Sequence, residues 1–252
     1  MTSRQRKLDA VVARLQLQYG PCAIRKAAAA PPAPVAHIST TFPDLDAALG
    51  IGGLPRGRIT EIIGPATSGK VTLAAKVLSA AQRDKEALVA WLDLSNSCDP
   101  DYLHRCGLDL DRLLIVRPRD AADALAITRH LVESKALAAL VFESMPISGP
   151  GLADLASIDQ GILTGTLERL AAAVTLNECV VIFLTEPHAQ SRTLAHGATV
   201  RLAIRRERWI TRGPDVRGYE GQVEIVKHKL GRAGAVTPIR IIFNGTVRGE
   251  GL

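Results

Sequence analysis

Gly64-Pro65-Ala66-Thr67-Ser68-Gly69-Lys70-Val71-Thr72 is the stretch that decides the fold, because it nearly matches the phosphate-binding loop pattern G-x-x-x-x-G-K-[ST]. Glycines at both ends let the backbone curl so that successive N–H groups point inward, and the N-terminus of a following helix favours an anion. Lys70 is then expected to reach the outer phosphates. Val71 departs from the pattern, since it has no hydroxyl to hold a magnesium ion. The loop therefore indicates nucleotide binding more strongly than catalysis, with a weak or absent magnesium site.

The residues on both sides of this loop have the order that a phosphate-binding loop requires. Residues 58–63 form a β-branched, apolar stretch typical of a short buried strand. After the loop, Leu73, Val77 and Leu78 have helical spacing in an alanine-rich segment. The alternative is a glycine turn that merely connects a strand to a helix, and the match in context makes this alternative the weaker one.

The rest of the chain predicts an α/β protein with a mainly parallel sheet flanked by helices and an antiparallel C-terminal edge. We expect further strands at 87–92, 113–116, 138–142 and 179–184, and helices at 42–49, 102–106, 121–134 and 162–176. Three strands joined by turns follow at 199–206, 221–229 and 238–243. Ligands of such sheets bind at the carboxyl ends of the strands. Four candidate residues fall there: Gly64, Asp93, Glu143 and Glu186.

The N-terminal segment predicts an arm that precedes a compact core. Residues 6–19 have the pattern of an amphipathic helix with an apolar stripe made of Leu8, Val11, Val12, Leu15 and Tyr19. Such a helix is too short to be stable alone, so its stripe must dock on this protein's own core or on a neighbouring molecule. We expect an arm with a short strand over 1–26, an Ala/Pro linker over 27–36 and the nucleotide-binding core over 37–252.

Composition limits the class of protein. The 252 residues include no apolar run long enough to span a bilayer and no leader-like N-terminus, so we expect a soluble, cytoplasmic protein without a membrane partner. The four cysteines, at positions 22, 98, 106 and 179, lack C-x-x-C spacing. This pattern indicates reduced thiols, with neither a zinc site nor a disulfide framework. A net charge of +6 leans toward a polyanionic partner but also occurs in proteins that bind no nucleic acid.

The positive charge is concentrated in one late segment. Arg205, Arg206, Arg208 and Arg212 surround Trp209, with few acidic residues between them. Arginines around an aromatic ring can hold phosphates while the ring stacks on a base, which points to single-stranded DNA. A solvated β-hairpin whose arginines face water explains the same pattern equally well, and both interpretations stay open.

Several dispersed motifs together give the chain a specific resemblance. They are Ile38-Ser39-Thr40, Leu45-Asp46 with Ala48-Leu49-Gly50, Gly52-Gly53-Leu54-Pro55 with Gly57-Arg58-Ile59, Gly64-Pro65 with Ser68-Gly69-Lys70, Asp99-Pro100 with Tyr102, Val200-Arg201-Leu202 with Ile204-Arg205-Arg206, and Val226-Lys227 with Lys229. With them the chain resembles the bacterial recombinase RecA and its paralogues, from the N-terminal helix to nearly the last residue. The resemblance implies a RecA-like core that binds ATP, filaments on single-stranded DNA, and an arm that packs on the adjacent subunit. We expect a protein without the C-terminal domain that follows the core in typical members.

The resemblance assigns roles to residues outside the loop. It implies that Asp99 and Tyr102 contact adenine, and that Lys227 and Lys229 reach across a subunit interface toward the neighbour's phosphates. The alternatives are that Asp-Pro simply opens a helix and that the two lysines are solvated.

The catalytic positions of the family are changed in this chain. Ser95 stands where the family has the glutamate that activates water, and a serine is no general base at neutral pH. Glu143 replaces the aspartate linked to magnesium, and Glu186 replaces a hydrolysis-sensing glutamine, where its charge would repel a terminal phosphate. Together with Val71 these changes predict no efficient ATPase. Asp93 or Thr185, and a hydroxyl of Thr67, Ser68 or Thr72, remain as substitutes.

The two DNA-binding loops expected by resemblance are also altered. Residues 186–198 are short and offer only His188, Arg192 and His196 as contacts. Residues 148–160 are acidic through Asp154 and Asp159. A basic groove is hard to build from these residues, so any DNA contact is assigned to the arginine hairpin.

These observations predict a RecA-like accessory protein of DNA repair or damage tolerance that binds ATP but hydrolyses it poorly. It would contact a RecA-type recombinase or the translesion polymerase machinery, and could self-associate through its arm. In logic it is similar to the RecA-like accessory proteins of bacterial mutagenic translesion synthesis, the ImuA type. The alternatives are an active DNA-dependent ATPase that forms filaments on single-stranded DNA, and a structural module without nucleotide.

Overall fold

The computed structural model describes residues 2–20, 34–143, 158–187, 191–243 and 247–250. The chain divides into two compact units, residues 1–35 and 36–252. The first unit contains helix α1 (Ser3–Tyr19), which has no buried residue. The Thr2 side chain caps its start by accepting from the N–H of Gln5. The predicted helix over 6–19 is therefore confirmed and starts three residues earlier. The strand expected near residue 22 and most of the linker lie outside the described residues.

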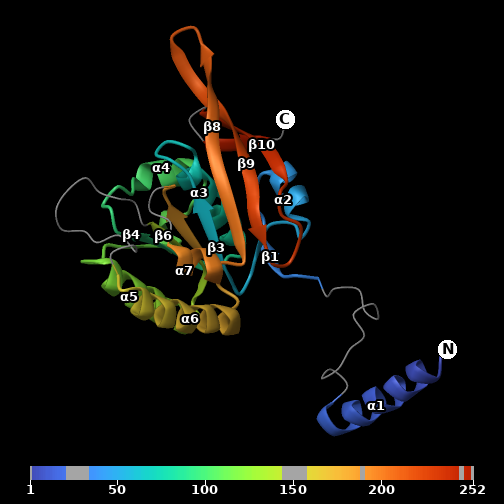
Figure 1. Cartoon of the computed structure of the whole chain (residues 1–252). Coiled ribbons are helices and arrows are strands. Elements are labelled where there is room, and N and C mark those ends of the chain that lie inside the picture. The colour runs from blue at the N-terminus through green and yellow to red at the C-terminus, as the bar shows by residue number, and fades with distance from the viewer. Residues whose placement is uncertain (1, 21–33, 144–157, 188–190, 244–246, 251–252) are drawn as a thin grey trace. The chain divides into compact units, whose positions relative to one another are not determined.

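A nine-stranded sheet forms the centre of the second unit (Figure 1), in the order β11-β10-β9-β8-β3-β7-β6-β4-β5. The six strands from β8 to β5 run parallel: β8 (Val200–Arg212), β3 (Arg58–Ile63), β7 (Val180–Thr185), β6 (Leu137–Glu143), β4 (Leu88–Asp93) and β5 (Leu113–Val116). The last three strands pair antiparallel: β9 (Asp215–His228), β10 (Val236–Phe243) and β11 (Val247–Glu250). The predicted mainly parallel sheet with an antiparallel C-terminal edge is confirmed.

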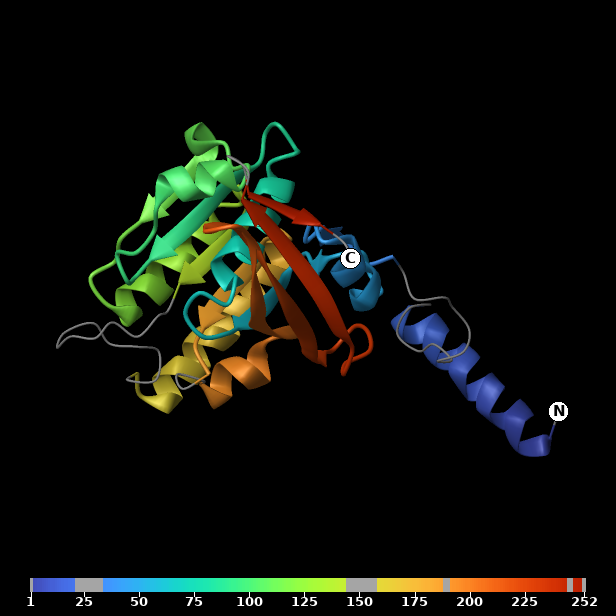
Figure 2. The same cartoon turned by 90° about the horizontal axis from the view of Figure 1, so that it is seen from above.

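Both faces of the parallel strands are apolar, because helices cover them from two sides (Figure 2). One face packs with α3 (Lys70–Ala81) and α4 (Pro100–Arg105) around Trp91 and Ile182, and α2 (Pro43–Leu49) joins the same core beside β9 and β10. The other face packs with α5 (Ala121–Glu133), α6 (Gln160–Asn177) and α7 (Arg192–Gly197) around Phe142 and Phe183. Neighbouring residues along each strand thus enter different cores.

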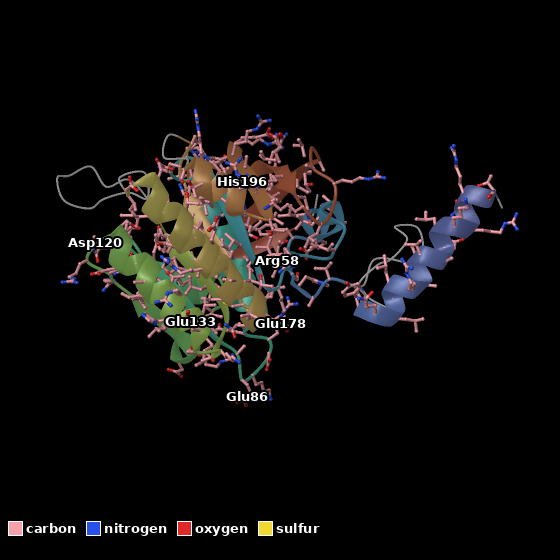
Figure 3. All side chains as sticks on the ribbon, turned by 60° about the horizontal axis from the view of Figure 1, so that its bottom comes forward. Arg58, Glu86, Asp120, Glu133, Glu178 and His196 are labelled. Atoms are coloured by element: carbon pink, nitrogen blue, oxygen red, sulfur yellow. The ribbon has the colours of Figure 1, made fainter. Side chains whose placement is uncertain are left out.

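The starts of four covering helices, α4 to α7, are fixed by side-chain caps. Figure 3 looks onto α5 and α6, with Asp120 at the start of α5 and Glu133 at its end. Asp120 accepts from the N–H of Asp123, and Asp159 accepts from the first N–H groups of α6. Asp159 therefore caps a helix, and its place in an acidic DNA loop stays a prediction. The rest of that expected loop, including Asp154, falls on residues that are not described.

The largest difference from the predicted elements is the hairpin of β8 and β9. The prediction ended the first strand at residue 206 and began the second at 221, but the strands pair as far as Arg212 and Asp215 (Figure 1). Alternating burial stops after Ile204 because the hairpin extends beyond the core, so the polar sequence gave no strand signal. One of the two alternatives for this segment was a β-hairpin whose arginines face water. The hairpin and the exposure of most of its arginines are confirmed.

Several short elements were not predicted. Strands β1 (His37–Ile38) and β2 (Leu54–Pro55) pair only two residues, and η1 (Leu110–Arg112) is a single turn. Helix α7 lies inside the segment 186–198 that we expected to be a loop, and it begins where Ser191 accepts from the N–H of Leu194. Such elements are too short for a periodic pattern to develop.

No described helix is long and apolar enough to cross a membrane. Within the described part of the chain, the thiols of Cys98, Cys106 and Cys179 are unpaired, and the fourth cysteine, at position 22, lies outside it.

Candidate nucleotide-binding site

The glycine loop joins the carboxyl end of β3 to the N-terminus of α3, as the sequence predicts. Gly69 has φ 101°, and a Cβ at this position would lie 2.6 Å from the Tyr219 hydroxyl. Thr67 also has a positive φ, of 60°. This curled backbone is the arrangement that presents N–H groups to an anion in front of a helix N-terminus. The local geometry therefore fits phosphate.

Lys70 is buried, with 2% of its side chain exposed. Its ammonium donates to the carbonyl of Gly64 at 2.7 Å and to that of Pro65 at 3.2 Å, and it lies 3.4 Å from the Glu186 carboxylate. Burial lowers the pKa of Lys70, while the charge of Glu186 opposes this effect. The lysine that would bind phosphates is thus held by the loop itself and by one acidic side chain.

The loop hydroxyls have different partners. The Thr72 hydroxyl lies 2.6 Å from that of Tyr102 and 3.3 Å from that of Tyr219, while Thr67 accepts from the Arg206 guanidinium. Ser68 is buried and its hydroxyl has no hydrogen-bond partner among the described residues. A buried hydroxyl without a partner is costly, and a phosphate oxygen would satisfy it. Val71 packs against the apolar core instead of offering an oxygen.

A hollow of about 250 Å³ adjoins the loop and α3. Its walls include four aromatic rings, which suit a planar base, and they come from the loop, α3, α4, β8, β9 and β10: Thr67, Gly69, Lys70, Val71, Thr72, Tyr102, Trp209, Tyr219 and Phe243. The rings of Trp209 and Tyr219 meet edge to face at 5.8 Å. The predicted loop and Tyr102 are brought together here. The contributions of Trp209, Tyr219 and Phe243 were missed, because they depend on the pairing of β8, β9 and β10.

Asp99 lies at the start of α4, and its side chain is exposed. Its Oδ1 accepts from the N–H groups of Asp101 and Tyr102, so it acts as a helix cap. The alternative interpretation of Asp-Pro as a helix start is therefore correct. A contact between Asp99 and a base stays a prediction.

The acidic side chains at the strand ends are already engaged. Asp93 is fully buried, pairs with Arg117 at 3.1 Å and accepts from the N–H groups of Ser97 and Cys98. Glu143 accepts from the Trp91 indole at 2.7 Å and from the Ser97 hydroxyl at 3.1 Å, and burial raises its pKa. Ser95 lies 2.7 Å from the Ser97 hydroxyl. Each oxygen of Asp93 and Glu143 thus already accepts from a protein donor, and the described residues hold no group of three or more acidic, histidine or cysteine side chains placed to bind a metal ion.

The two lysines on and after β9 contact α7. Lys227 donates to the carbonyls of Ala195 and His196, and Lys229 donates to the carbonyl of His196. Burial, followed by the charge of Lys229, lowers the pKa of Lys227. Within this chain they stabilise the C-terminal end of a helix, where cations are favourable. Their role at a subunit interface stays a prediction, as does that of Arg192 and His196 in DNA contacts; His188 is not described.

The four hairpin arginines make different contacts, and only Arg206 reaches the phosphate loop. Arg206 contacts Thr67 of the loop and stacks over the Trp209 ring at 4.1 Å, and Arg208 pairs with Glu220. Arg205 donates to Gln222, and Arg212 is exposed near the tip. The structure thus ties one of the predicted DNA residues to the phosphate loop, which sequence analysis had kept separate.

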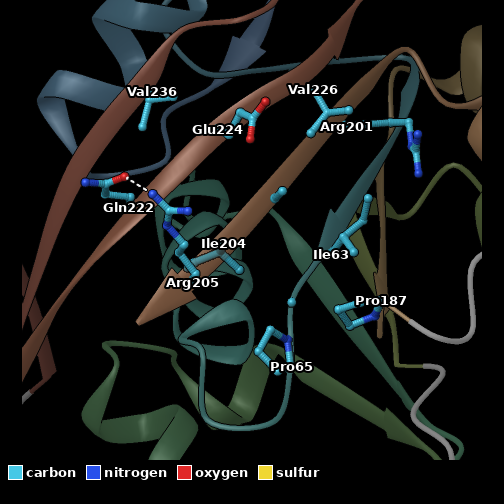
Figure 4. A pocket seen from close by; sticks show the side chains of 12 residues that line it. Ile63, Pro65, Pro187, Arg201, Ile204, Arg205, Gln222, Glu224, Val226 and Val236 are labelled. Atoms are coloured by element: carbon cyan, nitrogen blue, oxygen red, sulfur yellow. Dashed lines mark hydrogen bonds between the residues drawn. The ribbon is translucent and has the colours of Figure 1, made fainter. Parts of the chain in front are cut away.

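A second hollow, of about 330 Å³, lies on the other side of β8 and β9 (Figure 4). In it the Arg205 and Gln222 side chains bond to each other, and Glu224 and Val226 line the same wall. Gly64 and Pro65 border this hollow as well.

The predicted interface residues of the arm all lie on α1. Leu8 and Val11 are exposed by 55% and 43%, and Val12 and Leu15 are half-buried. Nothing described tests their docking, which stays a prediction.

Comparison with known proteins gives consistent matches along almost the whole chain. The family model of the RecA N-terminal domain matches residues 6–248. Protein RecA of Paracoccus denitrificans is 33% identical over 99% of this chain and 74% of its own length, and Protein RecA of Streptomyces avermitilis is 30% identical over 99% and 71%. The solved structure of the RadB recombinase has a TM-score of 0.64 at 20% identity, covering 85% of this chain and 99% of its own, and shows the shared fold. The chain therefore belongs to the RecA family.

Proposed function

We propose that this protein is a nucleotide-binding accessory protein of DNA repair or damage tolerance, which hydrolyses ATP poorly and acts by contacting a recombinase or a translesion polymerase. Membership of the RecA family supports a role in DNA repair or recombination and supports nucleotide binding in general. The accessory role and the ImuA-type branch are our own inference. The observation that carries it is the state of the acidic groups around Lys70.

Nucleotide binding is supported by three features of one site. The loop curls in front of α3, Lys70 lies at the first position of that helix, and Ser68 has a buried hydroxyl without a described partner. Next to them, the aromatic hollow offers faces for a base. ATP is the nucleotide that the family suggests. When bound, it would supply the phosphates that Lys70 and the loop N–H groups hold.

Poor hydrolysis follows from the absence of an available base among the described strand-end residues. Asp93 is buried in an ion pair with Arg117, and Glu143 accepts from two side chains. Ser95 offers only a hydroxyl, which is no general base at neutral pH. A general base must accept a proton from water within hydrogen-bond reach, and loss of one such group typically costs 10²–10⁴-fold in rate. Glu186 pairs with Lys70, so its own carboxylate is not available without freeing that lysine.

The experiment combines ATP binding with phosphate release, with and without single-stranded DNA, on one preparation. Lys70→Ala should weaken ATP binding by about 10- to 100-fold, since hydrogen bonds to charged groups contribute about 1.5–3 kcal/mol. Lys85→Ala, at an exposed lysine in a turn, is the matched control and should bind normally. Tight, Lys70-dependent binding without release supports the proposal. DNA-stimulated release would overturn it and favour an active recombinase, and no binding would leave a structural module.

Single-stranded DNA is the second ligand that we infer, and the hairpin is where it would bind. Trp209 is 47% exposed and Arg212 lies exposed beyond it, an arrangement suited to stacking and phosphate contact. Replacing Arg212 by alanine should weaken binding of a labelled single strand and reduce its dependence on salt. Unchanged binding and salt dependence would remove the hairpin from the DNA contact.

A partner recombinase or polymerase would meet the arm. The stripe of α1 offers Leu8 and Leu15 for such a contact. Pull-down of a RecA-type recombinase by this protein should be lost when both leucines are replaced by aspartate. Retention of the recombinase would exclude the arm as the contact.

A further inference from the structure

The contact between Lys70 and Glu186 lies at the centre of the phosphate loop. Lys70 begins α3 and Glu186 directly follows β7, so the sheet order brings residues 116 positions apart to 3.4 Å. Only 2% of the Lys70 side chain and 19% of that of Glu186 are exposed. In a site this poorly hydrated, the interaction between two charges is screened less than at the surface.

The lysine of a phosphate-binding loop contacts the two outer phosphates of a nucleotide. Here a carboxylate already lies within ion-pair distance of that ammonium. A second acidic residue, Glu143 at the end of β6, also raises the pKa of Lys70 through its charge. Any phosphate that approaches Lys70 therefore meets fixed negative charge, and the repulsion grows with each added phosphate charge.

We propose that Glu186 is a specificity-determining residue that makes this site bind nucleoside diphosphates more tightly than nucleoside triphosphates. The inference rests on the proposed nucleotide binding. A diphosphate needs only the loop N–H groups and Lys70 to hold its outer phosphate. A triphosphate must bring a further charged group past Lys70, where the Glu186 carboxylate lies. The site then discriminates by repulsion of the wrong ligand.

The test is calorimetric titration of ADP and ATP, each with magnesium, into the full chain and into Glu186→Gln. The glutamine keeps the size of the side chain and its ability to hydrogen-bond, but removes the charge. Glu168→Gln is the matched control, because Glu168 is exposed on α6 and its loss changes the net charge equally. The unaltered protein and the control should bind ADP at least tenfold more tightly than ATP, a difference of about 1.4 kcal/mol.

Glu186→Gln should bring the ratio of the two dissociation constants close to one, mainly through tighter ATP binding. Measurable binding in which the unaltered protein favours ATP or does not discriminate would overturn this inference alone. A preference for ADP that persists in Glu186→Gln would likewise assign it to other residues and overturn the inference. If neither protein binds either nucleotide, the proposed function fails and this inference fails with it. ATP binding that appears only in Glu186→Gln supports the inference.

Discussion

Arg201 forms a buried ion pair beneath the phosphate loop, and its replacement by methionine gives a quantitative test of the architecture. Arg201 lies opposite Glu61 in the parallel pair of β3 and β8, with Nε 2.6 Å from the carboxylate. Glu61 is fully buried, and its other oxygen accepts from the Thr185 hydroxyl at 2.9 Å. One carboxylate therefore joins three adjacent strands just before the loop.

The cost of Arg201→Met is set by the charge that it leaves behind. Only 14% of the Arg201 side chain is exposed, so water cannot replace the guanidinium fully. Removing one partner of a buried pair typically costs about 3–5 kcal/mol, because the remaining charge is uncompensated. For a chain of this size each kcal/mol shifts Tm by about 2–4 °C, so the expected loss is about 6–20 °C.

The assay is thermal and urea unfolding of Arg201→Met, Glu61→Gln and the double variant. The double variant should be more stable than Arg201→Met, because no buried charge is left without a partner. A loss below about 1 kcal/mol for Arg201→Met, the range of exposed pairs, would refute the argument. A double variant no more stable than Arg201→Met would show that lost packing, not lost pairing, causes the effect.

Three further predictions concern separate parts of the chain. Burial lowers the pKa of His228 below 6.5, so the unfolded state binds more protons between the folded and unfolded pKa values. Stability should therefore rise with pH through that window. His228→Asn should make the urea midpoint less dependent on pH between about pH 5 and 7. Nucleotide should change the fluorescence of Trp209, which lines the aromatic hollow, and Trp209→Phe should remove the change while the buried second tryptophan still emits. If the arm mediates self-association, Leu8→Asp with Leu15→Asp should reduce the mass measured by light scattering, whereas Leu17→Asp, at a position 91% exposed, should not.

The sequence was sufficient for the elements whose signal is local. The loop around Lys70 lies between a β-branched strand and an alanine-rich helix. The order strand, loop and helix identifies a phosphate-binding loop without reference to the rest of the chain. The strand β5 was predicted with its bounds, since four apolar residues lie between turns. The start of a helix at Asp99-Pro100 was also predicted, as one of two alternatives for these residues.

What could not be predicted depends on sheet order and register. The sequence placed Glu186 at the same edge of the sheet as the loop, but its direct contact with Lys70 requires β7 to lie beside β3, which periodicity does not encode. The aromatic hollow requires Trp209 to pair with Tyr219 in a β8–β9 ladder that contains three irregularities. A shift of one residue would send Tyr219 to the opposite face of the hairpin. Such positions follow from long-range pairing, so they could only be observed.

The same pairing joins the hairpin to the nucleotide site. A Cβ on Gly69 would clash with the Tyr219 hydroxyl, so that ring lies directly on the loop, and Arg206 bonds to the Thr67 carbonyl and hydroxyl while it covers Trp209. Phosphates that reshape the loop would act on both contacts, because neither side chain can keep its place if Thr67 or Gly69 moves. Conversely, a polyanion that draws Arg206 away would release Thr67. By thermodynamic linkage such effects are reciprocal, so a nucleotide and a hairpin ligand whose binding both depends on the position of Arg206 would alter each other's affinity by the same factor.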